Sequence, residues 1–272
     1  MLSQALQGLS DLVTGGILLL GVRRSKRQTD SRFQFGYGRE VFFWVLIAGI
    51  IMFAGTGGLS LYFGYRHIAH PEPIENIWVA FLMLVVGFTT NCYAFQLSVR
   101  RLRQRGKGTA STWKRIIASS IIETKATFII DFLGTLAAFL GFIALALYLL
   151  TGNEWFDGLG SIVIGLTMMT GSALLMKDVR DLIVGKAVDD ETSRLIRATA
   201  QAVDGVNDVL DLRTMYLGSD RLLVILEVHI RDGEDTDRIE QITDNVKAAV
   251  RERVPMVEHI QVEAETPDEV TE

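Results

Sequence analysis

Two aspartates stand inside long apolar stretches of this 272-residue chain. Asp11 lies in the middle of residues 1–22, and Asp131 lies near the start of a run that continues to Leu150. A carboxylate within a bilayer is costly and usually marks a functional site. Two such groups on neighbouring helices would neutralise a divalent cation. The alternative is that they form hydrogen bonds between helices or lie at the membrane interface, as Asp157 could.

The neighbours of these aspartates decide which ligands could complete a metal shell. Hard divalent cations take oxygen ligands, and zinc takes about four ligands that usually include nitrogen or sulfur. Residues four apart share a helix face, so Gln7 lies beside Asp11. By the same spacing Thr127 lies beside Asp131, followed by Glu123. The candidate membrane site is therefore Asp11, Asp131, Gln7 and Thr127.

Four segments are long and apolar enough to cross a bilayer, which requires about 20 residues. The chain is 49% hydrophobic although 22% of its residues are charged, because the apolar runs are concentrated before residue 177. The sequence therefore predicts an all-α membrane bundle of about five spans. The spans are Val41–Tyr65, Ile77–Val99, Thr127–Leu150 and Phe156–Met176, with residues 2–22 as a weaker fifth.

Basic residues are unevenly distributed among the connections between these segments. Residues 23–39 contain six Arg or Lys and residues 100–115 contain seven, whereas residues 66–76 contain one Arg and residues 151–155 contain none. Loops rich in Lys and Arg remain in the cytosol. The pattern predicts that the two basic loops and everything after Met176 are cytosolic, and that the start of the chain is outside.

The charged C-terminal part predicts a small α+β domain. We expect domains at 1–180 (membrane) and 181–266 (cytosolic), with a disordered tail at 267–272. Apolar periodicity, caps and turn residues predict the order α-β-β-α-β for the second domain. The expected elements are a helix at Asp189–Val203, strands at Val206–Leu217 and Leu222–Ile230, a helix at Thr236–Val254 and a strand at His259–Glu263.

Several stretches together resemble a known family. They are the segment from Leu2 through the basic loop to FGYGRE at Phe35–Glu40, the run HPEPIEN at His70–Asn76, and TGNEWFDGLGSIVIG at Thr151–Gly165. The chain resembles the cation diffusion facilitators, which are proton-coupled exporters of zinc and other divalent metals. It is most similar to the branch that includes a mitochondrial and nuclear zinc transporter homologue.

This resemblance implies a six-helix bundle followed by a ferredoxin-like, metallochaperone-like cytosolic domain that forms a homodimer. The five expected spans would be helices 2–6, with the first helix missing before Met1. The family usually places His or Asp where this chain has Gln7, and His where it has Thr127. Because both are weak neutral ligands, the resemblance implies Zn²⁺ or a harder cation such as Mn²⁺ or Fe²⁺.

The resemblance also implies a second metal site in the cytosolic domain. His229 occupies a matching strand position, and Glu240, Glu263 and Glu265 lie near the positions of other ligands. The alternative is that His229 is an ordinary strand histidine. We interpret His67 and His70 as residues of an external loop.

We therefore expect a transporter that exports a divalent cation in exchange for protons. The rival hypothesis is a non-transporting relative that acts as a dimerisation or regulatory partner. We expect no enzyme, because no common hydrolase or phosphate-binding motif is present. We also expect no tightly bound cofactor and no nucleic-acid partner. The expected partners are a second copy, the lipid bilayer, divalent cations and protons, and the expected location is the cell (inner) membrane.

Overall fold

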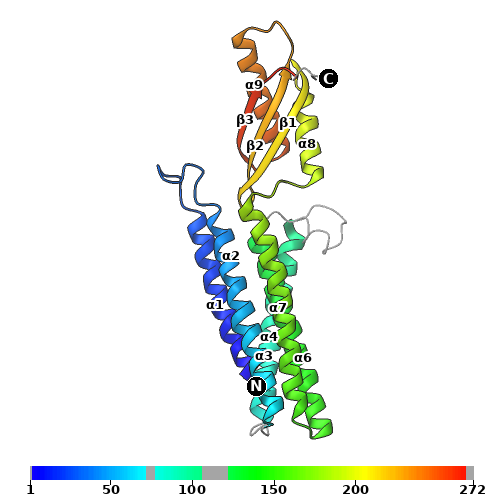
Figure 1. Ribbon diagram of the computed structural model, residues 1–272. Helices are drawn as coiled ribbons and strands as arrows, with labels where there is room; N and C mark the ends of the chain where they lie inside the picture. The colour runs from blue at the N-terminus through cyan, green and yellow to red at the C-terminus, as the bar shows by residue number, and fades with distance from the viewer. Residues whose placement is uncertain (1, 72–76, 106–121, 268–272) are drawn as a thin grey trace, which may run out of the picture. The chain divides into compact units, whose positions relative to one another are not determined.

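The computed structural model describes residues 2–71, 77–105 and 122–267 (Figure 1). The chain divides into two compact units, each described here by itself. The first contains Met1–Arg27 and Glu40–Arg180, and the second contains Gln28–Arg39 and Asp181–Glu272. Residues 268–272 of the predicted tail 267–272 lie outside the described residues.

The first unit is a bundle of long helices. Within the described ranges, Glu40–Ala69, Ile77–Arg100, Thr124–Thr151 and Trp155–Val184 are long and apolar enough to cross a membrane. The helix α1, residues Leu2–Ser25, packs in the same unit. The predicted class, an all-α membrane bundle followed by a small α+β domain, is confirmed. The remaining elements are α2 (Glu40–Ile51), η1 (Met52–Gly58), α3 (Leu59–Ala69), α4 (Ile77–Arg105), α6 (Ile122–Thr151) and α7 (Trp155–Val184).

The elements α2, η1 and α3 follow one another without a break and form one long helix, here called the rod. It contains two features that the sequence did not predict. Its middle is a π-helix, η1, which includes three glycines. It also ends later than expected, at Ala69, so the interpretation of His67 as a loop residue is wrong. His67 lies in the last turn of α3, and the N–H of His70 closes that turn by donating to the Arg66 carbonyl at 2.9 Å.

Glycines allow the rod to approach α7 closely. A Cβ atom on Gly64 would lie 2.8 Å from the carbonyl oxygen of Gly158. One on Gly165 would lie 2.9 Å from the carbonyl oxygen of Gly57. Small residues at such crossings bring helix backbones together in membranes, where packing rather than hydrophobicity drives association. Any larger side chain at these positions would separate the two helices.

The second unit has the predicted α-β-β-α-β order. The Asp189 side chain caps the first helix by accepting hydrogen bonds from the N–H groups of Glu191 and Thr192. The sheet order is β1-β2-β3, with β1 and β2 antiparallel and β2 and β3 parallel. The elements are α8 (Asp190–Gln201), β1 (Val206–Gly218), β2 (Arg221–Ile230), α9 (Thr236–Arg253) and β3 (Val257–Ala264).

Strict alternation along β2 separates a buried from an open sheet face. Every second residue from Leu222 to Ile230 is buried, whereas the residues between them are half-exposed. Buried apolar residues of both helices, including Ile196 and Ile242, complete the core. The helices therefore cover one face of the sheet and leave the other open.

The loop Gln28–Arg39 packs on this second unit. The Phe35 ring meets the His259 ring edge to face, with centroids 5.3 Å apart. Arg221 donates to the Phe35 carbonyl at 3.4 Å and also forms an ion pair with Glu258, to which it donates a second bond at 2.6 Å. This hydrogen bond lowers the pKa of the Glu258 carboxyl below its ordinary value.

Candidate functional site

A cavity of about 650 Å³ lies among α1, α4 and α6. Most of its lining is apolar, and its polar groups come from all three helices. Asp131 and Thr127 line it from α6, Thr90 and Asn91 line it from α4, and Thr14 lines it from α1. A mostly apolar pocket with a few convergent polar groups is the usual form of a binding site.

Helix α4 holds the Asp131 carboxylate in place. The Ser98 hydroxyl donates a hydrogen bond to Asp131 Oδ2. Packing of the Phe95 ring against Phe128 and Phe132, with centroids 5.2 and 5.9 Å apart, joins the same two helices. The Asp131 carboxylate is half-buried, and a hydroxyl on the neighbouring helix fixes its orientation.

One turn further along α6, Gly134 brings the two helices close together. A Cβ atom on Gly134 would lie 2.5 Å from the Asn91 side-chain oxygen. The Asn91 amide nitrogen donates to the Gly87 carbonyl at 3.0 Å, which fixes the orientation of the amide. Asn91 was not among the site residues predicted from the sequence. Ser98 was missed, although its spacing of seven from Asn91 places it on the same helix face.

The other two predicted site residues, Gln7 and Asp11, belong to α1. Their side chains, like that of Glu123 on α6, lie outside the described part of the structure. The backbone of α1 is described. Gly8, Gly15 and Leu18, which line the cavity, lie three before, four after and seven after position 11. Position 11 therefore belongs to the face of α1 that lines the cavity.

An ion pair and a histidine–aspartate contact in this unit were not predicted, because their partners are far apart in the sequence. Lys125 on α6 pairs with Asp178 on α7. His67 Nε2 on α3 lies 3.8 Å from Asp157 Oδ2 at the start of α7. Both pairs connect α7 to a neighbouring helix.

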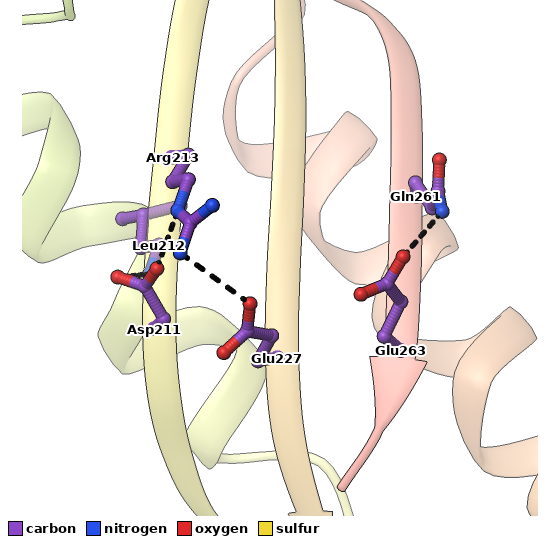
Figure 2. A network of polar contacts seen from close by, with 6 residues as sticks. All are labelled: Asp211, Leu212, Arg213, Glu227, Gln261 and Glu263. Atoms are coloured by element: carbon purple, nitrogen blue, oxygen red, sulfur yellow. Dashed lines mark hydrogen bonds and ion pairs between the residues drawn. The ribbon is translucent and has the colours of Figure 1, made fainter.

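Of the predicted cytosolic ligands, His229 and Glu265 are in contact, whereas Glu240 lies on the helix that covers the opposite face of the sheet. His229 Nδ1 lies 3.3 Å from the Glu265 carbonyl oxygen. Glu263 accepts a bond of 2.6 Å from Gln261 on the open sheet face (Figure 2). Glu240 is exposed on α9, which covers the opposite face. In the described ranges, no three or more His, Cys, Asp or Glu side chains form a group that could hold a metal. A cytosolic metal site stays a prediction.

A charged network lies on the open face, on strands β1 and β2 of the sheet that also carries Glu263 (Figure 2). Arg213 donates to Asp211 at 2.7 Å on its own strand and lies 3.9 Å from Glu227 on β2. The backbone N–H of Leu212, and then Arg213, lower the pKa of the Asp211 carboxyl. The network thus connects β1 to β2 through charge on a surface that the helices leave uncovered.

The two units correspond to two known family domains. Residues 1–184 match the cation efflux transmembrane domain. Residues 188–266 match the cytoplasmic domain of cation efflux proteins. The chain belongs to the cation efflux family. The predicted resemblance to the cation diffusion facilitators is therefore confirmed, and this cation efflux protein is an integral membrane protein with a cytosolic C-terminal domain.

Individual relatives share about a quarter of its residues. The mitochondrial proton-coupled zinc antiporter SLC30A9 of Homo sapiens is 26% identical over 95% of this chain and 47% of its own length. The metal cation efflux system protein CzcD of Cupriavidus metallidurans is 24% identical over 85% of this chain and 66% of its own. The chain thus spans about half the length of the human relative.

The second unit is also similar to solved structures. A nickel form of the MamM CTD is 24% identical in sequence to the matched part of this chain, with a TM-score of 0.28. The match covers 29% of this chain and 100% of the solved chain.

Proposed function

We propose that this protein exports a divalent cation from the cytosol in exchange for protons. The observation that carries the proposal is the cavity in the cation efflux transmembrane domain, where the Asp131 carboxylate lies beside Thr127 and opposite the α1 face that includes position 11. In this account Asp11 and Asp131 bind the cation, and Gln7 and Thr127 contribute neutral oxygens.

Charge balance couples the cation to protons. Two carboxylates close together in a medium of low dielectric cannot both stay ionised without a compensating cation or bound protons. A divalent metal removes this repulsion when it binds, and two protons remove it after the metal leaves. Exchange of one species for the other across the membrane is therefore favoured over release of an empty, doubly charged site.

The oxygen-only ligand set favours Zn²⁺ bound weakly, or a harder cation such as Mn²⁺ or Fe²⁺. Carboxylate, amide and hydroxyl oxygens match the preference of hard cations, whereas zinc sites usually include nitrogen or sulfur. We expect all three cations to bind at this one site and to differ in their affinity for it.

The protein acts as a homodimer in this proposal, since residues 188–266 match the family's cytoplasmic domain. We retain the cell membrane as its location. Cross-linking in membranes tests the first point, and fractionation of the source cells tests the second, with a mitochondrial location as the contrary result.

Transport in proteoliposomes tests the proposal. We expect an imposed Zn²⁺, Mn²⁺ or Fe²⁺ gradient to drive proton flux of the opposite sign, reported by a trapped pH dye. Asp131→Asn should abolish this flux. Asp157→Asn, a matched carboxylate change at the start of α7, should leave most of it. No flux from the native protein with any of the three cations would contradict the proposal and favour the non-transporting alternative.

A further inference from the structure

The C-terminal end of α1 carries a dense group of positive charges. Residues 23–27 include three arginines and one lysine, all of them exposed, and residues 12–29 contain no acidic residue. Within the described part of the chain, Arg23, Arg24 and Lys26 form no ion pair. The negative end of a helix dipole amounts to about half a charge, which cannot balance this group. An unmatched positive charge therefore remains at the end of the helix.

This end of α1 faces the cytosol. Four candidate spans in the described ranges separate the connection after α1 from the C-terminal domain. An even number of crossings returns the chain to the same side of the membrane, and the C-terminal domain is cytosolic. The cytosolic leaflet carries anionic lipids and a negative surface potential, which attract basic residues that follow a membrane helix.

One face of α1 joins these charges to an exposed apolar stripe. Leu19 lies four positions before Arg23, so the two side chains share a face, and Lys26 lies three positions beyond Arg23. Leu19 is 64% exposed, and Leu12, two turns earlier on the same face, is 77% exposed. Between them, a Cβ atom on Gly16 would meet nothing within 4 Å, so the stripe is open at that level.

The length of this face matches one leaflet. Leu12 and Arg23 are separated along the helix by about 16 Å, at 1.5 Å per residue. Half of the hydrocarbon core of a bilayer is about 15 Å thick. A lipid with its phosphate at Arg23 can therefore extend an acyl chain along the whole stripe.

Aromatic rings on α2 hold the charged end at the level of the headgroups. The Arg24 guanidinium lies over the Trp44 ring, 5.4 Å from its centroid. A Cβ atom on Gly21 would lie 2.7 Å from Trp44 Cβ, so the two helices touch at this level. The exposed Phe43 ring meets the Trp44 ring edge to face, with centroids 5.6 Å apart. Tryptophan is enriched at the boundary between membrane and water, which places this end of α1 there.

The charge of the site selects the type of lipid. Exposed leucines alone are ordinary in a helix that faces lipid, and they do not distinguish one phospholipid from another. A zwitterionic headgroup carries a cation beside its phosphate, so it leaves the charge of Arg23 and Lys26 unmatched. An anionic headgroup supplies the missing negative charge and accepts charge-assisted hydrogen bonds from both side chains.

We propose that this face of α1 is a binding site for one anionic phospholipid of the cytosolic leaflet. The headgroup phosphate binds Arg23 and Lys26, and an acyl chain lies along Leu19, Gly16 and Leu12. The bound lipid holds the cytosolic half of a helix that also lines the cation cavity. The site does not depend on the proposed antiport, because no transport step is needed for the lipid to bind.

Photocrosslinking of the full-length protein in liposomes tests the site. The sequence contains one cysteine, so Cys92→Ser with Leu19→Cys places a single benzophenone maleimide on this face. The liposomes contain equal amounts of phosphatidylglycerol and phosphatidylcholine, and mass spectrometry counts the two lipid adducts. We expect at least fivefold more phosphatidylglycerol adduct. The same label at Leu166→Cys on α7, where the side chain is 52% exposed, should capture the two lipids equally. Equal capture at both positions would overturn the proposal.

Charge variants test which residues select the lipid. Arg23→Gln with Lys26→Gln should bring the adduct ratio at Leu19→Cys to about one. Arg100→Gln with Arg101→Gln removes the same charge from the end of α4 and should leave the fivefold preference intact. A preference that survives the first pair, or that the second pair removes equally, would overturn the assignment to α1.

Salt provides a test that changes no residue of the site. In 1 M salt the Debye length is about 3 Å, so the preference for phosphatidylglycerol should fall toward one in the native charge background. A preference that salt does not change would overturn the role of charge. A label at Leu19→Cys that captures a second protein chain in place of lipid would overturn the proposal as well.

Discussion

Arg221 is predicted to hold the loop Gln28–Arg39 against the C-terminal domain. Its guanidinium donates to both carboxylate oxygens of Glu258 and to the Phe35 carbonyl. Gly36 approaches the same group, so that a Cβ there would lie 3.2 Å from it. The substitution Arg221→Met keeps an unbranched apolar stem and removes all three donated bonds.

The expected size of the effect follows from exposure. The Arg221 and Glu258 side chains are 26% and 37% exposed, so solvent weakens their attraction but does not remove it. Exposed pairs contribute about 0.2–1 kcal/mol, and hydrogen bonds to charged groups contribute about 1.5–3 kcal/mol. A paired-donor geometry at partial exposure should contribute about 1–2 kcal/mol. Since about 1.4 kcal/mol is tenfold, the loop should open about five- to thirtyfold more often.

Hydrogen exchange measures this opening directly. In the closed loop the Gly36 N–H donates to the Phe33 carbonyl at 2.9 Å, so peptides covering Gln28–Arg39 should be protected. Arg221→Met should speed the exchange of these peptides about five- to thirtyfold. Arg213→Met is the control, because Arg213 pairs with Asp211 and Glu227 (Figure 2) and should leave loop exchange unchanged. Unchanged exchange in Arg221→Met, or an equal increase in Arg213→Met, would refute the reasoning.

Three further predictions concern the two units. Arg221 lowers the pKa of Glu258, so their ion pair contributes its full stability above the ordinary glutamate pKa of 4.5 and loses it as the pH falls through the lower folded value. The difference in melting temperature between the native protein and Glu258→Gln should therefore shrink from about pH 7 to about pH 4. Gly134→Val should destabilise the membrane unit by about 1–3 kcal/mol, because the added atoms meet Asn91, and thermal unfolding in detergent would show no shift if the close approach were absent. Ile242→Ala should cost about 2–5 kcal/mol in chemical denaturation, since the side chain is fully buried under the sheet, and a loss below about 1 kcal/mol would contradict that packing.

Local sequence signals predicted the C-terminal domain well. Asp189 caps its first helix, the alternation from Leu222 to Ile230 gives a strand with one buried face, and Pro255 follows the last helix. Each of these signals acts over a few neighbouring residues. The attachment of the loop Gln28–Arg39 was not predictable in this way, because it depends on contacts with Arg221 and His259 far along the chain.

The membrane site was predictable only in part. The cost of a carboxylate in a span identified Asp131, and helical spacing identified Thr127 beside it; both line the cavity. Ser98, which bonds to Asp131, carries no such signal, because a serine in a span is ordinary. The π-helix at η1 was also missed, since glycines in a membrane helix are common and do not indicate a wider turn.

Calorimetry of cation binding in two buffers with different ionisation enthalpies tests the central claim most directly. If cation and protons compete for the carboxylates of Asp11 and Asp131, binding of Zn²⁺ or Mn²⁺ near neutral pH releases protons, and the measured heat depends on the buffer. Asp131→Asn should weaken cation binding at least a hundredfold. Asp157→Asn should leave the binding affinity and the number of released protons unchanged. Cation binding that releases no protons, or that survives Asp131→Asn intact, would contradict the account.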